Sequence, residues 1–333
     1  MTSTEWNPGK LLSTSGSYWM SAAIHAAVAL DLFTTIGEQK RSAEEIAEEH
    51  SASPRGVSAI LNALAAMGLI TKEDRKFLNT SFSKTFLSKD SPEYMGYIID
   101  HHHNLFASWG KLDQAVKTGT PTRARASHGD EKERQDFLRG MFNQGMRLAP
   151  QMARILDLSG VHRLLDLGGG PGTYGIHFCL ANPRLHATIL DLPTSEHLAK
   201  QTIDRFHLSD RVSFIAGDFL EDKIEGSYDV AFLSHILHGE GPENSQQIVN
   251  KAASCLTPDG RIIIHEFILN DSEDGPLFPA LFSLNMLVGT PRGQSYSERT
   301  LTEMLQGAGL IDIHRIPFKS PNDSGLLQGR RPS

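Results

Sequence analysis

Hydrophobic and polar positions in the second half of the chain form a repeating pattern of two kinds of segment. Short apolar runs at 164–167, 187–190, 212–216, 228–233, 260–265 and 311–316 have the length of buried strands. Segments with helical spacing occur at 173–181, 244–256, 277–287 and 300–307, the last with a capping box from Thr300 to Glu303. This alternation predicts a doubly wound α/β fold, in which helices cover both faces of a parallel sheet.

The first part of the chain shows mostly helical spacing. It predicts an alanine-rich helix at 18–36, a short helix after a capping box from Ser42 to Glu45, and a third that starts at Pro54 and ends at Gly68. Residues 72–87 predict a two-stranded ribbon, which completes a winged-helix arrangement. Because the 18–36 helix is poor in charge, we expect it to be buried in its own domain or against a second copy of the chain.

The chain therefore divides into three predicted parts. Residues 1–100 form the winged-helix domain and residues 161–333 form the α/β domain. Between them, residues 101–160 combine a helical stretch, a polar loop at 117–134 and a long helix at 137–158. A chain of 333 residues is long enough for two domains, each with its own core.

Composition and charge exclude several classes of partner. The net charge of −7 argues against nucleic acid or an anionic membrane, and the recognition-helix position of the winged helix carries one cation, Arg55. Two cysteines favour a reducing compartment, and the most apolar early stretch, 22–32, is too short to cross a bilayer. These features predict a cytoplasmic protein that binds neither DNA nor membrane. Three consecutive histidines, 101–103, point in different directions around a helix, so no metal site is expected there.

A glycine-rich turn follows the strand at 164–167, and an acid, Asp191, ends the next strand. Glycines let the backbone approach a ligand closely, and a carboxylate about 20 residues further on can accept both hydroxyls of a ribose. This arrangement favours a nucleoside-containing cofactor over a simple tight turn. A dinucleotide is less favoured because Thr173 replaces the last glycine of the Rossmann fingerprint, although an NAD-dependent dehydrogenase stays a rival interpretation.

Polar residues follow the other strands of the predicted sheet as well. Asp218, His238 and Glu266 each fall at or near the carboxyl end of a strand. In doubly wound sheets, ligands bind at these ends. We therefore expect these side chains to share one site with the glycine turn and Asp191.

Several short motifs occur in a fixed order along the chain. They are LDLGGGPG at the glycine turn, LDLP at 190–193, GDF at 217–219, LSHILH at 233–238, HEF at 265–267, ERT at 298–300 and GAG at 307–309. Together with the winged-helix region, they resemble the S-adenosylmethionine (SAM)-dependent O-methyltransferases. That family includes plant caffeate and flavonoid enzymes, acetylserotonin methyltransferases and bacterial enzymes of secondary metabolism. The resemblance covers about residues 18–316. It implies a class I SAM-methyltransferase sheet, Rossmann-like, with a mostly helical N-terminal winged-helix domain that forms a homodimer.

The resemblance also implies a role for individual residues. Those that would bind SAM are Gly168, Gly170, Asp191, Asp218, Phe219 and Ser234. His238 would be the catalytic base, flanked by the acids Glu266 and Glu298. Those that would contact a small, flat, hydroxylated acceptor, with the 101–160 region contributing to its pocket, are Trp109, Met141, Asn285 and Met286.

The implied chemistry needs few groups. A phenol has a pKa of about 10, so a histidine that removes its proton makes the oxygen nucleophilic. A carboxylate behind the imidazole fixes its tautomer. The family usually continues after this histidine with Asp or Asn and then Trp, whereas here Gly239 and Glu240 follow. This departure leaves open C- or N-methylation, or a non-methyl reaction, by a SAM-binding relative. A winged-helix regulator that binds a nucleoside ligand is the remaining alternative.

Overall fold

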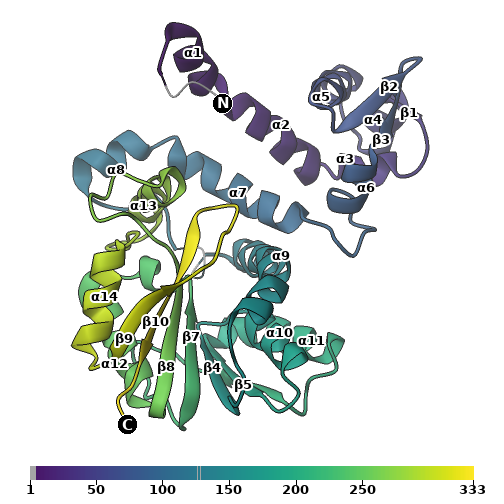
Figure 1. The fold of residues 1–333 in the computed structure, drawn as a ribbon. Coiled ribbons are helices and arrows are strands. Elements are labelled where there is room, and N and C mark those ends of the chain that lie inside the picture. Colours follow the sequence, from purple (N-terminus) through teal and green to yellow (C-terminus); the bar gives the residue numbers. More distant parts are fainter. Residues whose placement is uncertain (1–4, 126, 128) are drawn as a thin grey trace. The chain divides into compact units, whose positions relative to one another are not determined.

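The computed structural model describes residues 5–125, 127 and 129–333 (Figure 1). The chain forms two compact units, an N-terminal unit of residues 1–106 and a C-terminal unit of residues 107–333. The boundary falls inside one helix, α7 (Gly96–Trp109). The two units are described separately below. The predicted division at residues 100 and 160 stays a prediction.

The N-terminal unit has the predicted winged-helix elements. They are α1 (Pro8–Gly16), α2 (Tyr18–Ala29), α3 (Leu32–Ile36), β1 (Arg41–Ser42), α4 (Ala43–Glu49), α5 (Pro54–Ala66), β2 (Ile70–Glu73), β3 (Lys76–Asn79) and α6 (Ser81–Phe86). The three strands form a small sheet in the order β1-β3-β2. The capping box from Ser42 to Glu45 is confirmed, and Ser53 caps α5 with Pro54 in its first turn.

Two predictions for this unit were wrong in detail. The helix expected at 18–36 is broken after Ala29, because Asp31 adopts a left-handed conformation with φ of 54°. The ribbon expected at 72–87 ends at Asn79. The Thr80 side chain then accepts a hydrogen bond from the Ser83 N–H and starts the helix α6.

Large apolar side chains lie exposed on the first two helices of the N-terminal unit and just before them. Trp6, Leu11, Leu12, Tyr18, Trp19 and Met20 each expose more than half of their surface. The core of the unit is instead built from α2 to α5, with Leu32, Phe33, Ile46 and Leu61 fully buried. The expectation that the 18–36 segment is buried within its own domain therefore holds only for its second half.

The C-terminal unit is built around a seven-stranded sheet in the order β6-β5-β4-β7-β8-β10-β9. Its strands are β4 (Arg163–Leu167), β5 (His186–Asp191), β6 (Val212–Ala216), β7 (Tyr228–Ser234), β8 (Leu256–Phe267), β9 (Ile311–Ile316) and β10 (Ser324–Arg330). Its helices are α8 (Leu112–Thr118), α9 (Glu131–Ile155), α10 (Thr173–Ala181), α11 (Glu196–Arg205), α12 (Pro242–Ser254), α13 (Leu277–Gly289) and α14 (Glu298–Gly307). The predicted doubly wound α/β class is confirmed.

Three details differ from the prediction. The strand β10, which the pattern did not predict, pairs antiparallel with both β8 and β9, so the sheet is mixed rather than purely parallel. The helix α11 was also missed. The capping box at Thr300 is wrong, because α14 starts earlier and its cap is Ser297, whose side chain accepts from the Thr300 N–H.

Helices cover both faces of the sheet, and strand β4 shows how. Leu165 and Leu167 point into a core shared with α12 and α14. Leu164 points to the other face, into the core shared with α9, α10 and α11. Asp166 occupies the same side as Leu164, because side chains alternate along a strand. A carboxylate is thus buried just before the glycine turn.

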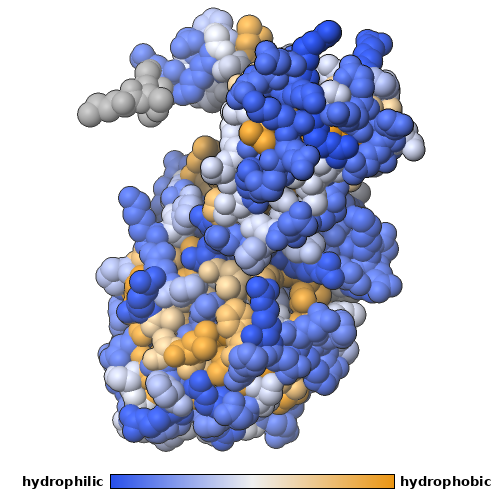
Figure 2. Space-filling view, turned by 90° about the vertical axis from the view of Figure 1, so that its right-hand side faces the viewer, coloured by the Kyte–Doolittle hydropathy of each residue, from blue (hydrophilic) through white to orange (hydrophobic). Residues whose placement is uncertain are grey.

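Two further observations concern the hydropathy of the surface and of the helices. Most of the face shown in Figure 2 is hydrophilic, with hydrophobic residues gathered in a few places. Within the described residues, no helix has both the length and the apolar character needed to cross a membrane.

Candidate active site

The glycine turn after β4 is shaped by positive φ angles and close packing. Gly168 has φ of 67° and Gly170 has φ of 50°, a region that side-chain-bearing residues rarely adopt. A Cβ on Gly168 would overlap the Ile236 side chain, and a Cβ on Gly169 would lie 2.6 Å from the Asp166 carboxyl carbon. The turn therefore presents bare backbone at the carboxyl end of the sheet.

Asp191 lies beside this turn, as the sequence predicted. Its Oδ2 accepts a hydrogen bond from the Gly170 N–H at 2.7 Å, and its Oδ1 accepts from the Leu192 N–H and the Ser195 hydroxyl at 2.7 and 2.8 Å. Burial raises the pKa of this carboxyl, and these hydrogen bonds oppose the rise. A carboxylate offers about four acceptor positions. Three of these acceptor positions are occupied here. To accept hydrogen bonds from both hydroxyls of a ribose, Asp191 would have to lose one of its present donors.

Asp166 is a residue of the site that the sequence interpretation did not assign. Its Oδ2 accepts from the Gly175 N–H at 3.0 Å, whereas its Oδ1 is buried with no hydrogen-bond partner among the described residues. Burial raises the pKa of Asp166 to about 7. A charged residue inside an apolar strand was the available signal, because a buried carboxylate without full hydrogen bonding is costly unless a ligand completes it.

The other three predicted SAM contacts are distributed around the same edge. The Phe219 ring lies 3.4 Å from where a Gly168 Cβ would be, so its apolar face borders the turn. The Asp218 carboxylate accepts from the Leu220 N–H at 2.8 Å and stays half-buried. The Ser234 hydroxyl lies 2.9 Å from Nδ1 of His265, which gives it a partner within the chain. Their contacts with the cofactor remain predictions.

His238 and Glu266 are joined directly. The Nδ1 atom of His238 lies 2.7 Å from Oε2 of Glu266, and the Glu266 side chain is only 2% exposed. Its Oε1 also accepts from the backbone N–H groups of Leu237 and His238, at 3.0 and 3.3 Å. His238 lies in a short 3-10 helix after β7, and Glu266 lies near the end of β8, so adjacent parallel strands bring the two together.

The electrostatics of the pair fix the proton on His238. Burial alone would raise the pKa of Glu266, but the neighbouring His238, which is hydrogen-bonded to it, and the nearby His235 hold it well below its usual value. An ionised carboxylate only accepts hydrogen bonds, so Nδ1 of His238 must be the donor. Nε2 of the neutral ring is then unprotonated. Among the described residues Nε2 has no hydrogen-bond partner, which leaves it available as a base.

Two histidines beside the pair were not predicted as part of the site. His235, with φ of 58°, places Nδ1 3.6 Å from the same Glu266 oxygen, and that nitrogen is buried without a hydrogen bond. Burial lowers the pKa of His235 and, more strongly, that of His265. A lowered pKa makes each ring a weaker proton acceptor, and both ring nitrogens of the fully buried His265 already lie 2.9 Å from the hydroxyls of Ser234 and Ser324. By spacing, His235, His238 and Glu266 also form a group that could hold a metal ion, but the His238–Glu266 hydrogen bond already joins two of them.

The structure does not bring Glu298 to this pair. Its side chain is 50% exposed and lies 3.5 Å from the Arg315 guanidinium on β9. No hydrogen bond or ion pair joins it to His238 within the part of the chain that the structure describes. Glu298 is the first residue of α14, and its backbone N–H donates to the carbonyl of Leu269, just after β8.

The predicted acceptor residues are partly assembled. The Trp109 indole N–H donates to Oδ1 of Asn285 at 3.2 Å, so these two lie together. Met286, next to Asn285 on α13, is 7% exposed and faces the core. Met141 lies half-buried on α9. Two unpredicted rings border His238: Phe282 meets it edge-on at 4.8 Å, and Phe267 stacks at 5.9 Å.

The departure from the family pattern after His238 has a structural explanation. A Cβ at Gly239 would overlap the guanidinium of Arg125, which comes from the 119–130 loop. Arg125 forms an ion pair with Glu240, whose side chain is 9% exposed. The glycine makes room for the arginine and the glutamate neutralises it. Gly239 and Glu240 are the two residues that follow His238 in the chain, where the resemblance implies Asp or Asn and then Trp.

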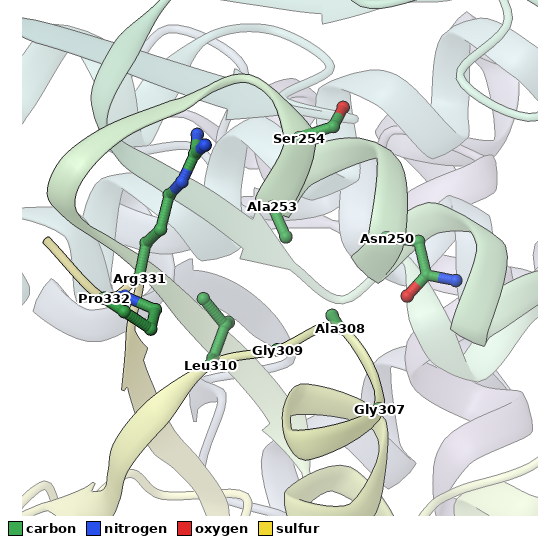
Figure 3. A pocket seen from close by; sticks show the side chains of 9 residues that line it. All are labelled: Asn250, Ala253, Ser254, Gly307, Ala308, Gly309, Leu310, Arg331 and Pro332. Atoms are coloured by element: carbon green, nitrogen blue, oxygen red, sulfur yellow. The ribbon is translucent and has the colours of Figure 1, made fainter.

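A surface pocket of about 500 Å³ lies elsewhere on the C-terminal unit (Figure 3). Its lining includes Asn250 of α12, Gly307 at the end of α14, and Arg331 just after β10. Arg330 pairs with Arg261, near the start of the parallel part of β8. The pocket is therefore at the amino ends of the parallel strands, opposite the edge that carries His238.

Comparisons with known proteins agree with this arrangement. A family model described as an O-methyltransferase domain matches residues 111–311, and one described as an O-methyltransferase dimerisation domain matches residues 12–89. The 3-hydroxy-5-methyl-1-naphthoate 3-O-methyltransferase of Streptomyces sahachiroi is 30% identical, over 97% of this chain and 95% of its own length. The tetracenomycin polyketide synthesis 8-O-methyl transferase TcmO of Streptomyces glaucescens is 29% identical, over 98% of this chain and 97% of its own length. The solved structure of PigF from Serratia sp. with SAH is 25% identical, covers 98% of this chain and 100% of that chain, and has a TM-score of 0.89.

The chain therefore belongs to the O-methyltransferase family. It is a SAM-dependent O-methyltransferase, as the motif order predicted, and the comparisons do not favour the dehydrogenase or regulator alternatives. The residues at the carboxyl edge fit SAM. Bare backbone at Gly168–Gly170 would let its methionine part approach closely, and the buried Asp166 oxygen, which has no partner among the described residues, would suit a ligand that carries positive charge.

Proposed function

We propose that this protein transfers a methyl group from SAM to a hydroxyl of a small aromatic acceptor, with His238 as the general base. The observation that carries the base assignment is the 2.7 Å contact between Nδ1 of His238 and the buried, ionised Glu266. That contact leaves Nε2 of His238 as the free acceptor of a proton. One relative supports an aromatic acceptor, because its name specifies a hydroxylated naphthoate, and the name of a second places it in tetracenomycin polyketide synthesis.

The roles of the chain's own groups follow from the geometry. When bound, SAM supplies the electrophilic methyl group. Nε2 of His238 accepts the proton of the acceptor hydroxyl, and Glu266 stabilises the imidazolium that results. Phe267 and Phe282 beside the ring exclude water and offer flat apolar surfaces to an aromatic acceptor. Trp109, Asn285, Met286 and Met141 are the further acceptor contacts that we propose.

We also propose that the protein is a homodimer formed by its N-terminal unit. The six exposed apolar side chains from Trp6 to Met20 lie in or next to the region matched by the dimerisation-domain model. A second copy that covers them would remove a large apolar surface from water. Sedimentation at micromolar concentration should give twice the chain mass. A monomer would overturn this part of the proposal.

Methyl transfer to matched acceptors tests the proposed reaction. The purified enzyme is incubated with methyl-labelled SAM and either 2-naphthol, 2-naphthylamine or 2-methoxynaphthalene. We expect label only in 2-naphthol, as the methyl ether. Transfer to the amine or to ring carbon of the methoxy compound would instead indicate N- or C-methylation, and no transfer to any aromatic compound would reject the proposed acceptor class.

A further inference from the structure

A half-buried arginine in the 119–130 loop lacks a carboxylate partner. Arg123 donates one hydrogen bond from Nη1, to the carbonyl of the adjacent Ala124 at 3.0 Å. Its Nε is buried without a partner, and Arg123 forms no ion pair within the described residues. A guanidinium carries five N–H donors, so the described residues use only a small part of its capacity. Burial lowers the pKa of Arg123, and the charge of exposed Glu133 only partly opposes this.

The surrounding backbone holds this arginine in place. The N–H of the preceding Thr122 donates to the carbonyl of Val288 at 3.0 Å, which ties the loop to the end of α13. The guanidinium lies against Gly289, and a Cβ there would overlap it. Arg125, in the same loop, differs from Arg123 because it forms an ion pair with the carboxylate of Glu240.

Arg123 shares one face of α13 with the reaction centre. Phe282, Asn285 and Gly289 follow one another at spacings of three and four residues, so they lie on the same side of the helix. Phe282 meets His238, Asn285 binds Trp109, and Gly289 contacts Arg123. Gly289 follows Phe282 by seven positions, which corresponds to about 10 Å along the helix axis. If the acceptor makes a hydrogen bond to His238 at one end and to Arg123 at the other, the remaining length fits one aromatic ring or two fused rings.

We infer that Arg123 is a specificity residue that binds a carboxylate of the acceptor, so that the preferred substrates are aromatic hydroxy acids. The hydroxyl meets Nε2 of His238, the rings lie along α13 beside Phe282 and Trp109, and the carboxylate completes the free donors of Arg123. The carboxylate belongs to the acceptor rather than to SAM, since Arg123 packs on α13 whereas the glycine turn follows β4. This inference rests on the proposed O-methylation of aromatic acceptors.

The test compares 3-hydroxy-1-naphthoic acid with its primary amide, which has the same shape without the charge. Charge-assisted bonds to a guanidinium predict that the wild-type enzyme uses the acid at least about tenfold better in kcat/KM, mainly through KM. Arg123→Gln should lower kcat/KM for the acid to the level of the amide and leave the amide unchanged. Arg123→Lys should keep part of the preference, and Arg299→Gln, an exposed control, should keep all of it.

The possible results distinguish a failure of the Arg123 inference from a failure of the proposed O-methylation. Equal use of acid and amide by the wild-type enzyme would overturn the inference without needing any variant to fold. An Arg123→Gln variant that loses activity equally on both would overturn it too, because that indicates a structural role. If the acid, the amide and 2-naphthol all fail to accept a methyl group, the proposed function itself is wrong and the inference falls with it.

Discussion

Replacement of Glu266 by glutamine tests how the imidazole is held. In the native site, Oε1 accepts two backbone N–H groups, from Leu237 and His238, and Oε2 accepts Nδ1–H of His238. Glutamine has one oxygen and one NH₂ group. If the NH₂ faced the two backbone donors, two buried N–H groups would lose their acceptor, at roughly 1–3 kcal/mol each.

The amide oxygen of Glu266→Gln should therefore face the backbone and its NH₂ should face His238. Nδ1 must then accept, and the ring proton moves to Nε2, where it blocks base catalysis. We expect kcat to fall by roughly 10²–10⁴-fold, the range for a lost general base or a reversed tautomer, with SAM affinity little changed. The assay is steady-state methyl transfer from labelled SAM, with calorimetry for SAM binding.

Glu243→Gln is the matched control, because Glu243 is exposed and, in the described part of the chain, forms an ion pair only with the exposed Arg292. Its kcat should equal that of the wild type. A Glu266→Gln enzyme that stays folded, binds SAM and turns over within twofold of the wild type would refute the tautomer argument. A general loss of folding would be visible by circular dichroism, and Glu266→Asp, which keeps the acceptor charge, would then give the comparison.

Three further predictions follow from single side chains. The pKa of Asp166 is about 7 in the fold, so the folded protein keeps a proton that the unfolded chain releases near pH 4. The free energy of unfolding should therefore fall by very roughly 4 kcal/mol as pH rises from about 4 to 7. Urea unfolding of the SAM-free protein should show that Asp166→Asn lacks this pH dependence, and an unchanged pH dependence in the variant would contradict the assignment. Asp191→Ala removes the acceptor beside Gly170 and should weaken SAM binding by about tenfold or more in calorimetry, whereas equal affinity would reject its role. Glu298→Gln should change kcat by no more than about fivefold, because its exposed pair with Arg315 is weak; a loss as large as that of Glu266→Gln would restore the catalytic role that the motif implied.

The sequence predicted the fold where a pattern repeats locally. The glycine turn, its two strands and the acid at Asp191 form a continuous βαβ unit, and each element has its own periodic signal. The strand β10 lacks one, because only Leu326 and Leu327 form an apolar run and its pairing with both β8 and β9 is set at long range. The helix α11 was detectable, since Ala199, Thr202 and Ile203 are buried at helical spacing.

Contacts within the site were predictable only where strand ends bring motifs together. His238 and Glu266 meet because β7 and β8 are parallel neighbours. The Arg125–Glu240 pair joins residues far apart in sequence, and no local sequence pattern predicts it. Glu298 is the opposite case, and its catalytic role stays a prediction. Its motif matches the family, but its side chain pairs with Arg315, and the direction of a side chain at a helix start does not follow from a motif.

The most direct measurement of the central claim compares acceptors of different acidity on a His238→Ala enzyme. In single-turnover experiments at saturating SAM, one acceptor is a phenol with a pKa of about 10, and the other is a nitro-substituted analogue already ionised at the assay pH. If Nε2 of His238 removes the acceptor proton, the variant loses at least about 10² in rate on the phenol and little on the ionised analogue. An equal loss on both acceptors would contradict the assignment of His238 as the base.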